Sequence, residues 1–167
     1  MIEVRIDDPA FYRGEAMAWP VDATLGATTP LLRRVELAAG PALTARPALA
    51  EPLPVGAAVV TGAGHLGVEW LIHAVIMSRE EHTSRDGVRR ALLSALQRAT
   101  DFRIGELAVV PFGIGAGNLD AEESADVMID VMRQHGARSA HPRSIVVIVE
   151  TEMEHTVWIS RLTRTGA

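Results

Sequence analysis

The 167-residue chain contains no cysteine and no lysine. The absence of cysteine excludes disulfides, thiolate zinc sites and cysteine nucleophiles. All sixteen basic residues are arginine, which excludes the phosphate-binding lysine of a Walker loop. It also excludes Schiff-base chemistry, because arginine stays protonated and cannot act as an amine nucleophile. Long apolar runs are missing too, and no segment approaches the ~20 apolar residues of a membrane-spanning helix.

Length and charge bound the remaining possibilities. Domains typically run to roughly 100–200 residues, so we expect one domain over residues 1–167. The net charge of −5 disfavours nucleic acid as a partner, since broad attachment needs a concentrated basic face. The first five residues carry charges where a signal peptide needs apolar ones, which favours a cytoplasmic protein with no membrane partner.

Hydrophobic periodicity predicts strands that alternate with three helices. The predicted strands cover residues 2–6, 16–19, 57–60, 70–76, 107–110, 145–149 and 157–159. One helix is expected to begin at Pro30, with Thr29 as its N-cap, and to end at Gly40-Pro41. A second follows a capping box at residues 83–86, and a third runs from an Asp120–Glu123 cap to a stop at Gly136.

These elements predict an α/β fold, a three-layer α/β/α sandwich with a mixed sheet. Pro20 is expected to end the second strand, because proline lacks the N–H that a strand interior requires. Residues 42–54 hold three of the nine prolines and are interpreted as an irregular connection.

A glycine-rich loop follows the predicted strand at residues 107–110. Glycines occupy alternate positions in Gly113-Ile114-Gly115-Ala116-Gly117, followed by Asn118. At a strand-to-helix passage, such a backbone can approach a phosphate without a Cβ in the way. The spacing differs from the dinucleotide pattern GxGxxG, and a glycine-rich connection without a ligand is the alternative.

Other chemistry is less well supported. No pair of the six histidines has a metal-ligand spacing, so no metal site and no cofactor are predicted. His73, inside an apolar strand, is interpreted as a core residue. The group of Glu152, Glu154 and His155 suits a solvated turn better than a metal site. Trp70 and Met77 fit core positions, with a contact in a homo-oligomer as the alternative.

The order of these motifs resembles the macro domain family, which binds ADP-ribose and in some members hydrolyses its conjugates. The segment Val59-Val60-Thr61-Gly62-Ala63-Gly64-His65-Leu66 is similar to a strand and turn of the family, and residues 70–75 are similar to its "YVIHTV" strand. Residues 111–117 are similar to its second phosphate loop with one residue deleted. The resemblance implies that the loop from Gly113 to Asn118 holds phosphates and that His65 lies near the ligand.

The front half matches the family in spacing and differs in chemistry. Asp8 matches the family's adenine-binding carboxylate, but Pro9 cannot supply the neighbouring backbone N–H. Asp22 stands where the family has the second Asn of "NAAN", so an amide donor becomes a carboxylate acceptor. The first phosphate loop falls on residues 27–30 without a glycine, and the acidic position of the hydrolases falls on Leu32.

The first hypothesis is therefore a divergent macro-like domain that binds ADP-ribose, a related nucleotide or a phosphorylated ribose, with Asp8, Asp22 and His65 lining the cleft. A ligand-free module for oligomeric assembly is a second hypothesis. The third is hydrolysis of ADP-ribose conjugates with Asp22 as the catalytic residue. Whether the protein is an enzyme stays open at this point, because the usual hydrolase residues are largely replaced.

Overall fold

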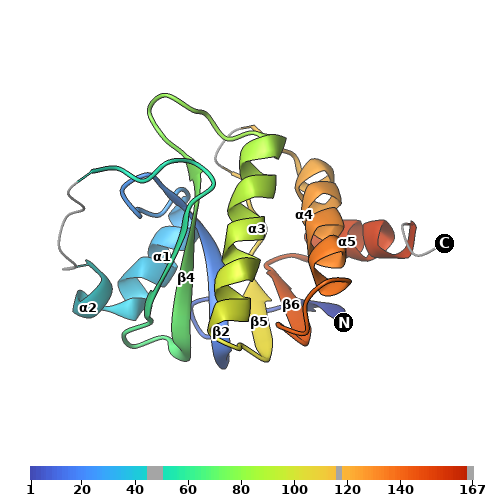
Figure 1. The fold of residues 1–167 in the computed structure, drawn as a ribbon, viewed down its shortest axis with the longest axis horizontal. Coiled ribbons are helices and arrows are strands. Elements are labelled where there is room, and N and C mark those ends of the chain that lie inside the picture. The colour runs from blue at the N-terminus through green and yellow to red at the C-terminus, as the bar shows by residue number, and fades with distance from the viewer. Residues whose placement is uncertain (45–50, 116–117, 165–167) are drawn as a thin grey trace.

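Six strands form one mixed sheet in the computed structural model, which describes residues 1–44, 51–115 and 118–164 (Figure 1). The sheet order is β1-β6-β5-β2-β4-β3. All neighbours are parallel except β3, which pairs antiparallel with β4 at the edge. The strands are β1 (Ile2–Ile6), β2 (Arg13–Asp22), β3 (Ala58–Gly62), β4 (Gly67–Met77), β5 (Glu106–Val109) and β6 (Ser144–Val149).

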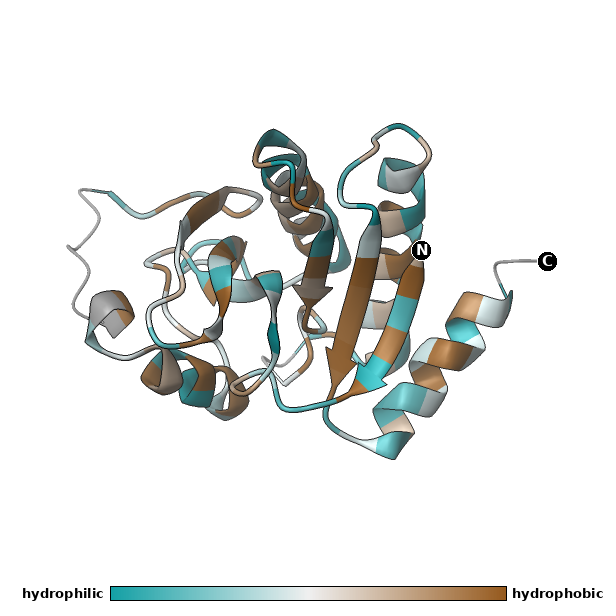
Figure 2. Cartoon of the chain, turned by 90° about the horizontal axis from the view of Figure 1, so that it is seen from below, coloured by the Kyte–Doolittle hydropathy of each residue, from teal (hydrophilic) through white to brown (hydrophobic). Residues whose placement is uncertain are grey.

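Helices cover both faces of this sheet, which confirms the predicted three-layer arrangement. One apolar core contains buried residues of α1 (Pro30–Ala39) and Leu43 of the short α2 (Pro41–Thr44), and the other contains buried residues of α3 (Arg85–Asp101) and α4 (Ala121–Gly136). The apolar strands lie between the two helical layers in Figure 2. The last helix, α5 (Glu152–Arg164), packs against α4 and β1. None of the helices in the described part of the chain is both long and apolar enough to cross a bilayer.

The strand predicted at residues 157–159 is wrong, because these residues belong to α5. The run Val157-Trp158-Ile159 has the residue types of a strand, but only Trp158 is fully buried, within the core shared with α3 and α4. Over α5 as a whole, Glu154, His155, Trp158, Arg161 and Leu162 are less exposed than most of their neighbours. This spacing of three and four residues is that of a helix face, whereas a strand would bury alternate positions.

Pro20 does not end β2, which continues to Asp22. Backbone groups of Ala18 face β5, since the Ala18 carbonyl accepts a hydrogen bond from Val110 at 3.3 Å. Pro20, two residues further, faces the same side, but β5 pairs with β2 only as far as Ala18. The missing N–H of Pro20 therefore costs no ladder hydrogen bond.

Three local predictions also need correction. The cap of α3 is Ser84 rather than Thr83, with the Ser84 hydroxyl accepting from the Gly87 N–H at 3.0 Å. The third predicted helix includes Gly136, and its C-cap is Ala137. Part of the connection at 42–54 is helical in α2, while residues 45–50 lie outside the described residues. The caps at Thr29 and at Asp120–Glu123 are confirmed.

Candidate ligand-binding cleft

The carboxyl ends of β1, β6, β5 and β2 meet at one edge of the sheet, because these strands are mutually parallel neighbours. Ligands of open α/β sheets bind at this edge. The segment after β1 carries Asp8, β2 ends at Asp22, the glycine loop follows β5, and Glu150 follows β6. The topology therefore brings four segments from distant parts of the chain together.

A cavity of about 180 Å³ opens at this edge. Its walls come from the start of α1, the loop after β5, the end of β6 and the segment after β1. The lining residues are Pro9, Thr29, Pro30, Leu31, Leu32, Val110, Pro111, Ile114, Gly115, Ile148, Val149, Glu150 and Glu154. Most of these side chains are apolar, and the carboxylates lie on the β6–α5 side.

The glycine loop requires its glycines for two reasons. Gly113 and Gly115 have φ angles of +86° and +77°, a region that other residues rarely adopt. A Cβ on Gly113 would lie 2.8 Å from Leu119 Cδ1, and a Cβ on Gly115 would lie 3.3 Å from Thr29 Cγ2. Gly115 thus sits directly against Thr29, the N-cap of α1, and both residues line the cavity.

The backbone N–H groups at Gly113, Ile114 and Gly115 have no hydrogen-bond partner among the described residues. The residue before them is held firmly, because the Phe112 N–H donates to Met128 Sδ and the Phe112 carbonyl accepts from Ser124 Oγ. Unengaged amides in a loop of this kind form an anion-binding surface. Ala116 and Gly117, predicted to contribute to the same surface, lie outside the described residues.

The N-terminus of α1 adds to this surface. Thr29 Oγ1 accepts from the Leu32 N–H at 3.2 Å, and the Thr29 carbonyl accepts from Arg33. Pro30 has no N–H, and in the described part of the chain the Leu31 N–H has no partner. The positive end of the helix dipole therefore lies next to the glycine loop, an arrangement that suits an anion beside both. Sequence analysis missed Thr29 as part of the site because the loop before it has no glycine.

Asn118 fastens the loop rather than facing the cavity. Its Nδ2 donates to the Thr83 carbonyl at 2.6 Å, and Asn118 is absent from the cavity walls. The predicted role in ligand binding becomes a structural one, which ties the loop after β5 to the segment before α3.

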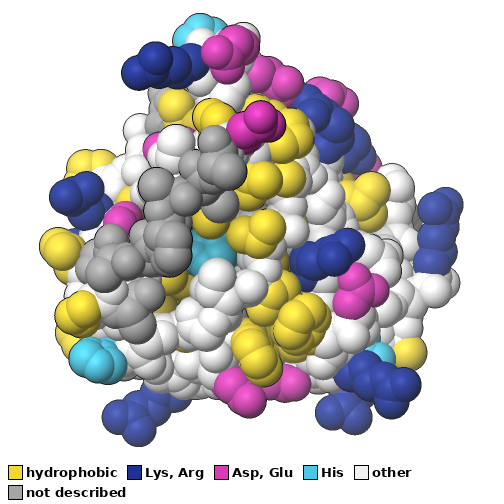
Figure 3. Space-filling view, turned by 60° about the vertical axis from the view of Figure 1, so that its left-hand side comes forward, with side chains coloured by type: hydrophobic (Ala, Val, Ile, Leu, Met, Phe, Trp, Pro, Cys, Tyr) yellow, Lys and Arg dark blue, Asp and Glu magenta, His cyan; other side chains and the backbone are white. Residues whose placement is uncertain are grey.

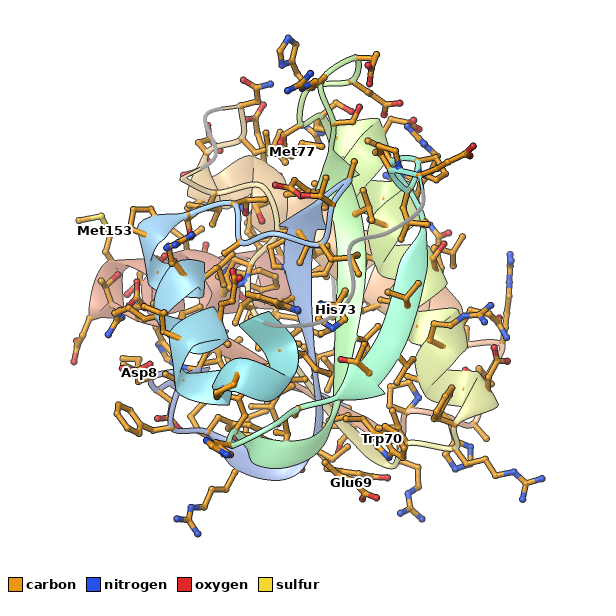
Figure 4. All side chains as sticks on the ribbon, turned by 90° about the vertical axis from the view of Figure 1, so that its left-hand side faces the viewer. Asp8, Glu69, Trp70, His73, Met77 and Met153 are labelled. Atoms are coloured by element: carbon orange, nitrogen blue, oxygen red, sulfur yellow. The ribbon has the colours of Figure 1, made fainter. Side chains whose placement is uncertain are left out.

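Asp8 lies beside α1 (Figure 4) and precedes Pro9, which lines the cavity. Its Oδ1 accepts from the Ala10 N–H at 2.9 Å, and its Oδ2 forms an ion pair with Arg34 at 3.3 Å. Arg34 also pairs with Glu150 at 3.0 Å. The sequence does not reveal Arg34 or Glu150 as part of this region, because a bridge between α1 and two loops leaves no local pattern.

Asp22 organises the turn after β2. Its Oδ1 accepts from the Thr24 N–H, the Thr24 hydroxyl and the Gly26 N–H, at 2.8, 2.7 and 3.0 Å. Asp22 lines a second cavity of about 480 Å³, together with Arg79 and His82 from the β4–α3 segment. The structure therefore places Asp22 at the same sheet edge as the glycine loop but in a separate cavity.

His65 does not join the other predicted residues. Because β3 runs antiparallel to β4, the turn between them lies at the amino ends of β2 and β4. The His65 N–H donates to the Ala39 carbonyl at 2.9 Å, near the C-terminal end of α1. The Gly113 loop lies at the opposite edge of the sheet, so His65 is not placed to contact a ligand in this cleft.

His73 is buried in the middle of β4, as expected for a core residue (Figure 4). Its Nδ1 accepts from the Trp19 indole N–H at 2.9 Å, and its Nε2 lies 2.8 Å from Thr61 Oγ1. Because the indole can only donate, Nδ1 carries no proton and Nε2 donates to Thr61. Within the described residues, no group of three His, Asp or Glu side chains could hold a metal ion.

Charges around the cleft are mixed rather than segregated. On the side of the molecule drawn in Figure 3, basic and acidic side chains are both scattered over the surface, and neither kind covers a whole face. Of the described residues that line the cavity after β5, none is an arginine, whereas Glu150 and Glu154 are acidic. An anion in this cavity would therefore be held by backbone dipoles rather than by side-chain cations.

Solved structures share the fold over nearly the whole chain. An Oceanobacillus iheyensis macrodomain, described as a mutant with ADPR, matches with a TM-score of 0.85 and 15% identity over 98% of this chain and 92% of that one. A Trypanosoma brucei macrodomain described as a complex with ADP-ribose matches with a TM-score of 0.85 and 13% identity, over 96% of this chain and 68% of that one.

The sequence relatives are longer than the region that matches this chain. An uncharacterised protein of Mycobacterium tuberculosis is 28% identical over 81% of this chain, which spans only 38% of that relative. A macro domain-containing protein of Caldanaerobacter subterraneus is 29% identical over 53% of this chain and 58% of its own length. The family model for the macro domain matches residues 33–128, more than half of the sequence. The chain belongs to the macro domain family.

Proposed function

We propose that the cleft binds ADP-ribose, or a related nucleotide or phosphorylated ribose, through its phosphates. The unengaged N–H groups of Gly113, Ile114 and Gly115, opposite the N-terminus of α1, are the observation that carries this proposal. Both features favour an anion, and a diphosphate would reach from one to the other. Relatives of the same fold described with ADP-ribose or ADP support the choice of ligand class.

Titration calorimetry tests this proposal directly. We expect saturable heat with ADP-ribose, and weaker binding of ADP and of ribose 5-phosphate, which each contain only part of the ligand. No detectable heat of binding with any of the three ligands would overturn the proposal and favour the ligand-free assembly module. Heat with ribose 5-phosphate as strong as with ADP-ribose would instead assign the cleft to a smaller phosphorylated sugar.

The variant Gly115→Glu tests the location. The new side chain would project toward Thr29 and place a carboxylate where the phosphate should lie, so the affinity for ADP-ribose should fall at least tenfold. Gly136→Glu is a matched control, because it adds the same charge at the end of α4 where a Cβ meets nothing within 4 Å. Thermal melts of both variants separate lost binding from lost folding. Equal affinity in the two variants would place the phosphates elsewhere.

Hydrolysis of ADP-ribose conjugates by Asp22 is the second candidate function. Asp22 Oδ2 lies close to Gly26, where an added Cβ would be 2.9 Å from this oxygen. Within the described residues, Oδ2 accepts no hydrogen bond. Asp22→Asn would keep the acceptor that holds the Thr24–Gly26 turn and remove the charge. Turnover of a protein-linked ADP-ribose that disappears in Asp22→Asn would support catalysis, and unchanged turnover would exclude Asp22 as the base.

A further inference from the structure

Different walls of the cleft favour ligand groups of opposite polarity. The glycine loop and the N-terminus of α1 present N–H groups, which favour an anion. On the β6–α5 side of the same cavity, the charged side chains among the described lining residues are Glu150 and Glu154, both acidic. The inference drawn from this contrast rests on the proposed function, in which the phosphates lie at the glycine loop. The base of a bound nucleotide would then lie beside the two carboxylates.

Glu154 is held in place and keeps one oxygen free. Its Oε2 accepts from the Glu150 N–H, the Thr151 N–H and the Thr151 hydroxyl, at 2.9, 3.1 and 3.3 Å. Its Oε1 accepts no hydrogen bond within the described residues. The contacts of Oε2 fix the carboxylate in the first turn of α5, so a ligand that donates to Oε1 does not have to order this side chain.

Glu150 is arranged in a similar way. Its Oε1 accepts from Arg34 Nη2 at 3.0 Å, and in the described part of the chain its Oε2 has no partner. Arg34 also pairs with Asp8, so one guanidinium is shared between two carboxylates and Glu154 adds a third. The wall therefore carries an excess of negative charge. It disfavours a second anion and favours a ligand group that donates N–H.

Asp8, the carboxylate that the family resemblance assigns to adenine, is less well placed for this role. Its Oδ1 accepts from the Ala10 N–H at 2.9 Å and its Oδ2 from Arg34 at 3.3 Å, so both oxygens already have a donor. The described residues that line the cavity include Pro9 but not Asp8. The accessible acceptors on this side of the cleft therefore belong to the β6–α5 segment rather than to the segment after β1.

We infer that Glu150 and Glu154 are specificity-determining residues of the cleft and accept the exocyclic amino group of a nucleobase, so that the ligand is a nucleotide whose base carries such a group. An ionised carboxylate can only accept, so it stabilises a base that presents an N–H and disfavours one that presents lone pairs alone. Hydrogen bonds to charged groups are also the stronger ones. Because the Glu150 side chain is 40% exposed, water competes for it, and we expect a preference of about tenfold rather than the far larger factors of buried sites.

The first test compares ADP-ribose with its 6-deamino analogue, in which a hydrogen atom replaces the amino group of adenine, by titration calorimetry on the whole chain. The two ligands share the diphosphate, both riboses and the purine ring. We expect ADP-ribose to bind about tenfold more tightly. Affinities within about twofold of each other would overturn the inference and leave the proposed function standing. Absence of binding by both ligands would overturn the proposed function as well.

The double variant Glu150→Gln/Glu154→Gln tests the two residues. Each glutamine keeps one oxygen for the protein's own donors, while the free oxygen becomes an amide donor. The preference for ADP-ribose should fall to within about twofold, and this ratio cancels any general effect of lost negative charge on phosphate binding.

Glu152→Gln is the matched control. It makes the same substitution between the two positions, on an exposed side chain that does not line the cavity, and it should keep the wild-type preference. Each single variant, Glu150→Gln or Glu154→Gln, should show an intermediate preference, so the test does not depend on the folding of the double variant. An unchanged preference in variants with intact circular dichroism would overturn the assignment of these two residues.

Discussion

Tyr12 should make the free energy of unfolding of this protein decrease at alkaline pH. The side chain is buried, at 3% exposure, and its hydroxyl donates to Glu106 Oε1 at 2.8 Å. Burial first, and then the hydrogen bond to Glu106, raises the pKa of Tyr12 from 10.0 to about 12. In the folded protein the phenol therefore stays protonated at pH values where the unfolded chain ionises.

The sign of the effect follows from this order of pKa values. A group whose pKa is raised by folding contributes its stability fully below the unfolded value and loses it as the pH rises through the folded value. Two pKa units correspond to about 3 kcal/mol. We expect the free energy of unfolding to fall by about 1 kcal/mol at pH 11 and by about 2 kcal/mol at pH 12, relative to pH 9.

The composition makes the assay unusually specific. The chain has one tyrosine, no cysteine and no lysine, so no other side chain of ordinary pKa titrates between pH 10 and 12. Urea unfolding followed by circular dichroism gives the free energy at each pH, and tyrosinate absorbance in native and unfolded protein gives the two pKa values. Tyr12→Phe should abolish the decline while leaving the ring in place. Parallel pH profiles for the wild type and Tyr12→Phe would refute the reasoning.

Two further predictions concern stability. Gly113→Ala should lower the free energy of unfolding, measured by urea titration, by about 1–3 kcal/mol. The φ of +86° at this position is unfavourable for alanine, and the new Cβ would lie 2.8 Å from Leu119 Cδ1. The control Gly136→Ala, at an open position on α4, should raise the free energy of unfolding slightly. Trp19→Phe should cost about 1–3 kcal/mol, because it removes the indole N–H that donates to buried His73 Nδ1. A loss no greater in Trp19→Phe/His73→Phe would support that cause in a double-mutant cycle.

Local patterns in the sequence identified the elements around the site that are contiguous along the chain. The Thr29 cap, the strand before Gly113 and the glycine spacing each depend on neighbouring residues, so they can be read without the fold. The helix at 152–164 was missed for a related reason. Its apolar run at Val157–Ile159 is short enough to fit either period, and only tertiary packing against Trp158 decides between them.

Relations between distant segments could not be read in this way. His65 was expected at the cleft because its segment follows a family-like strand, but the antiparallel pairing of β3 with β4 carries that turn to the other edge of the sheet. The Arg34 bridge joins residues 26 and 116 positions apart in the sequence, and no periodicity reports such a contact. Asp22 was recognised by position, whereas its three hydrogen bonds within the turn depend on the conformation of residues 24–26.

The way in which the glycine loop is held bears on the proposed phosphate site, because the cavity has no arginine among its described lining residues. Uncharged amides bind a phosphate tightly only if they are fixed before the ligand arrives, because ordering a loose loop would offset much of the favourable binding free energy. Phe112 is tied to α4 on one side of Gly113, and Asn118 is tied to Thr83 beyond the loop. With both ends anchored on the α3–α4 layer and Gly115 packed against Thr29 of the α1 layer, a phosphate at this point would contact both helical layers at once.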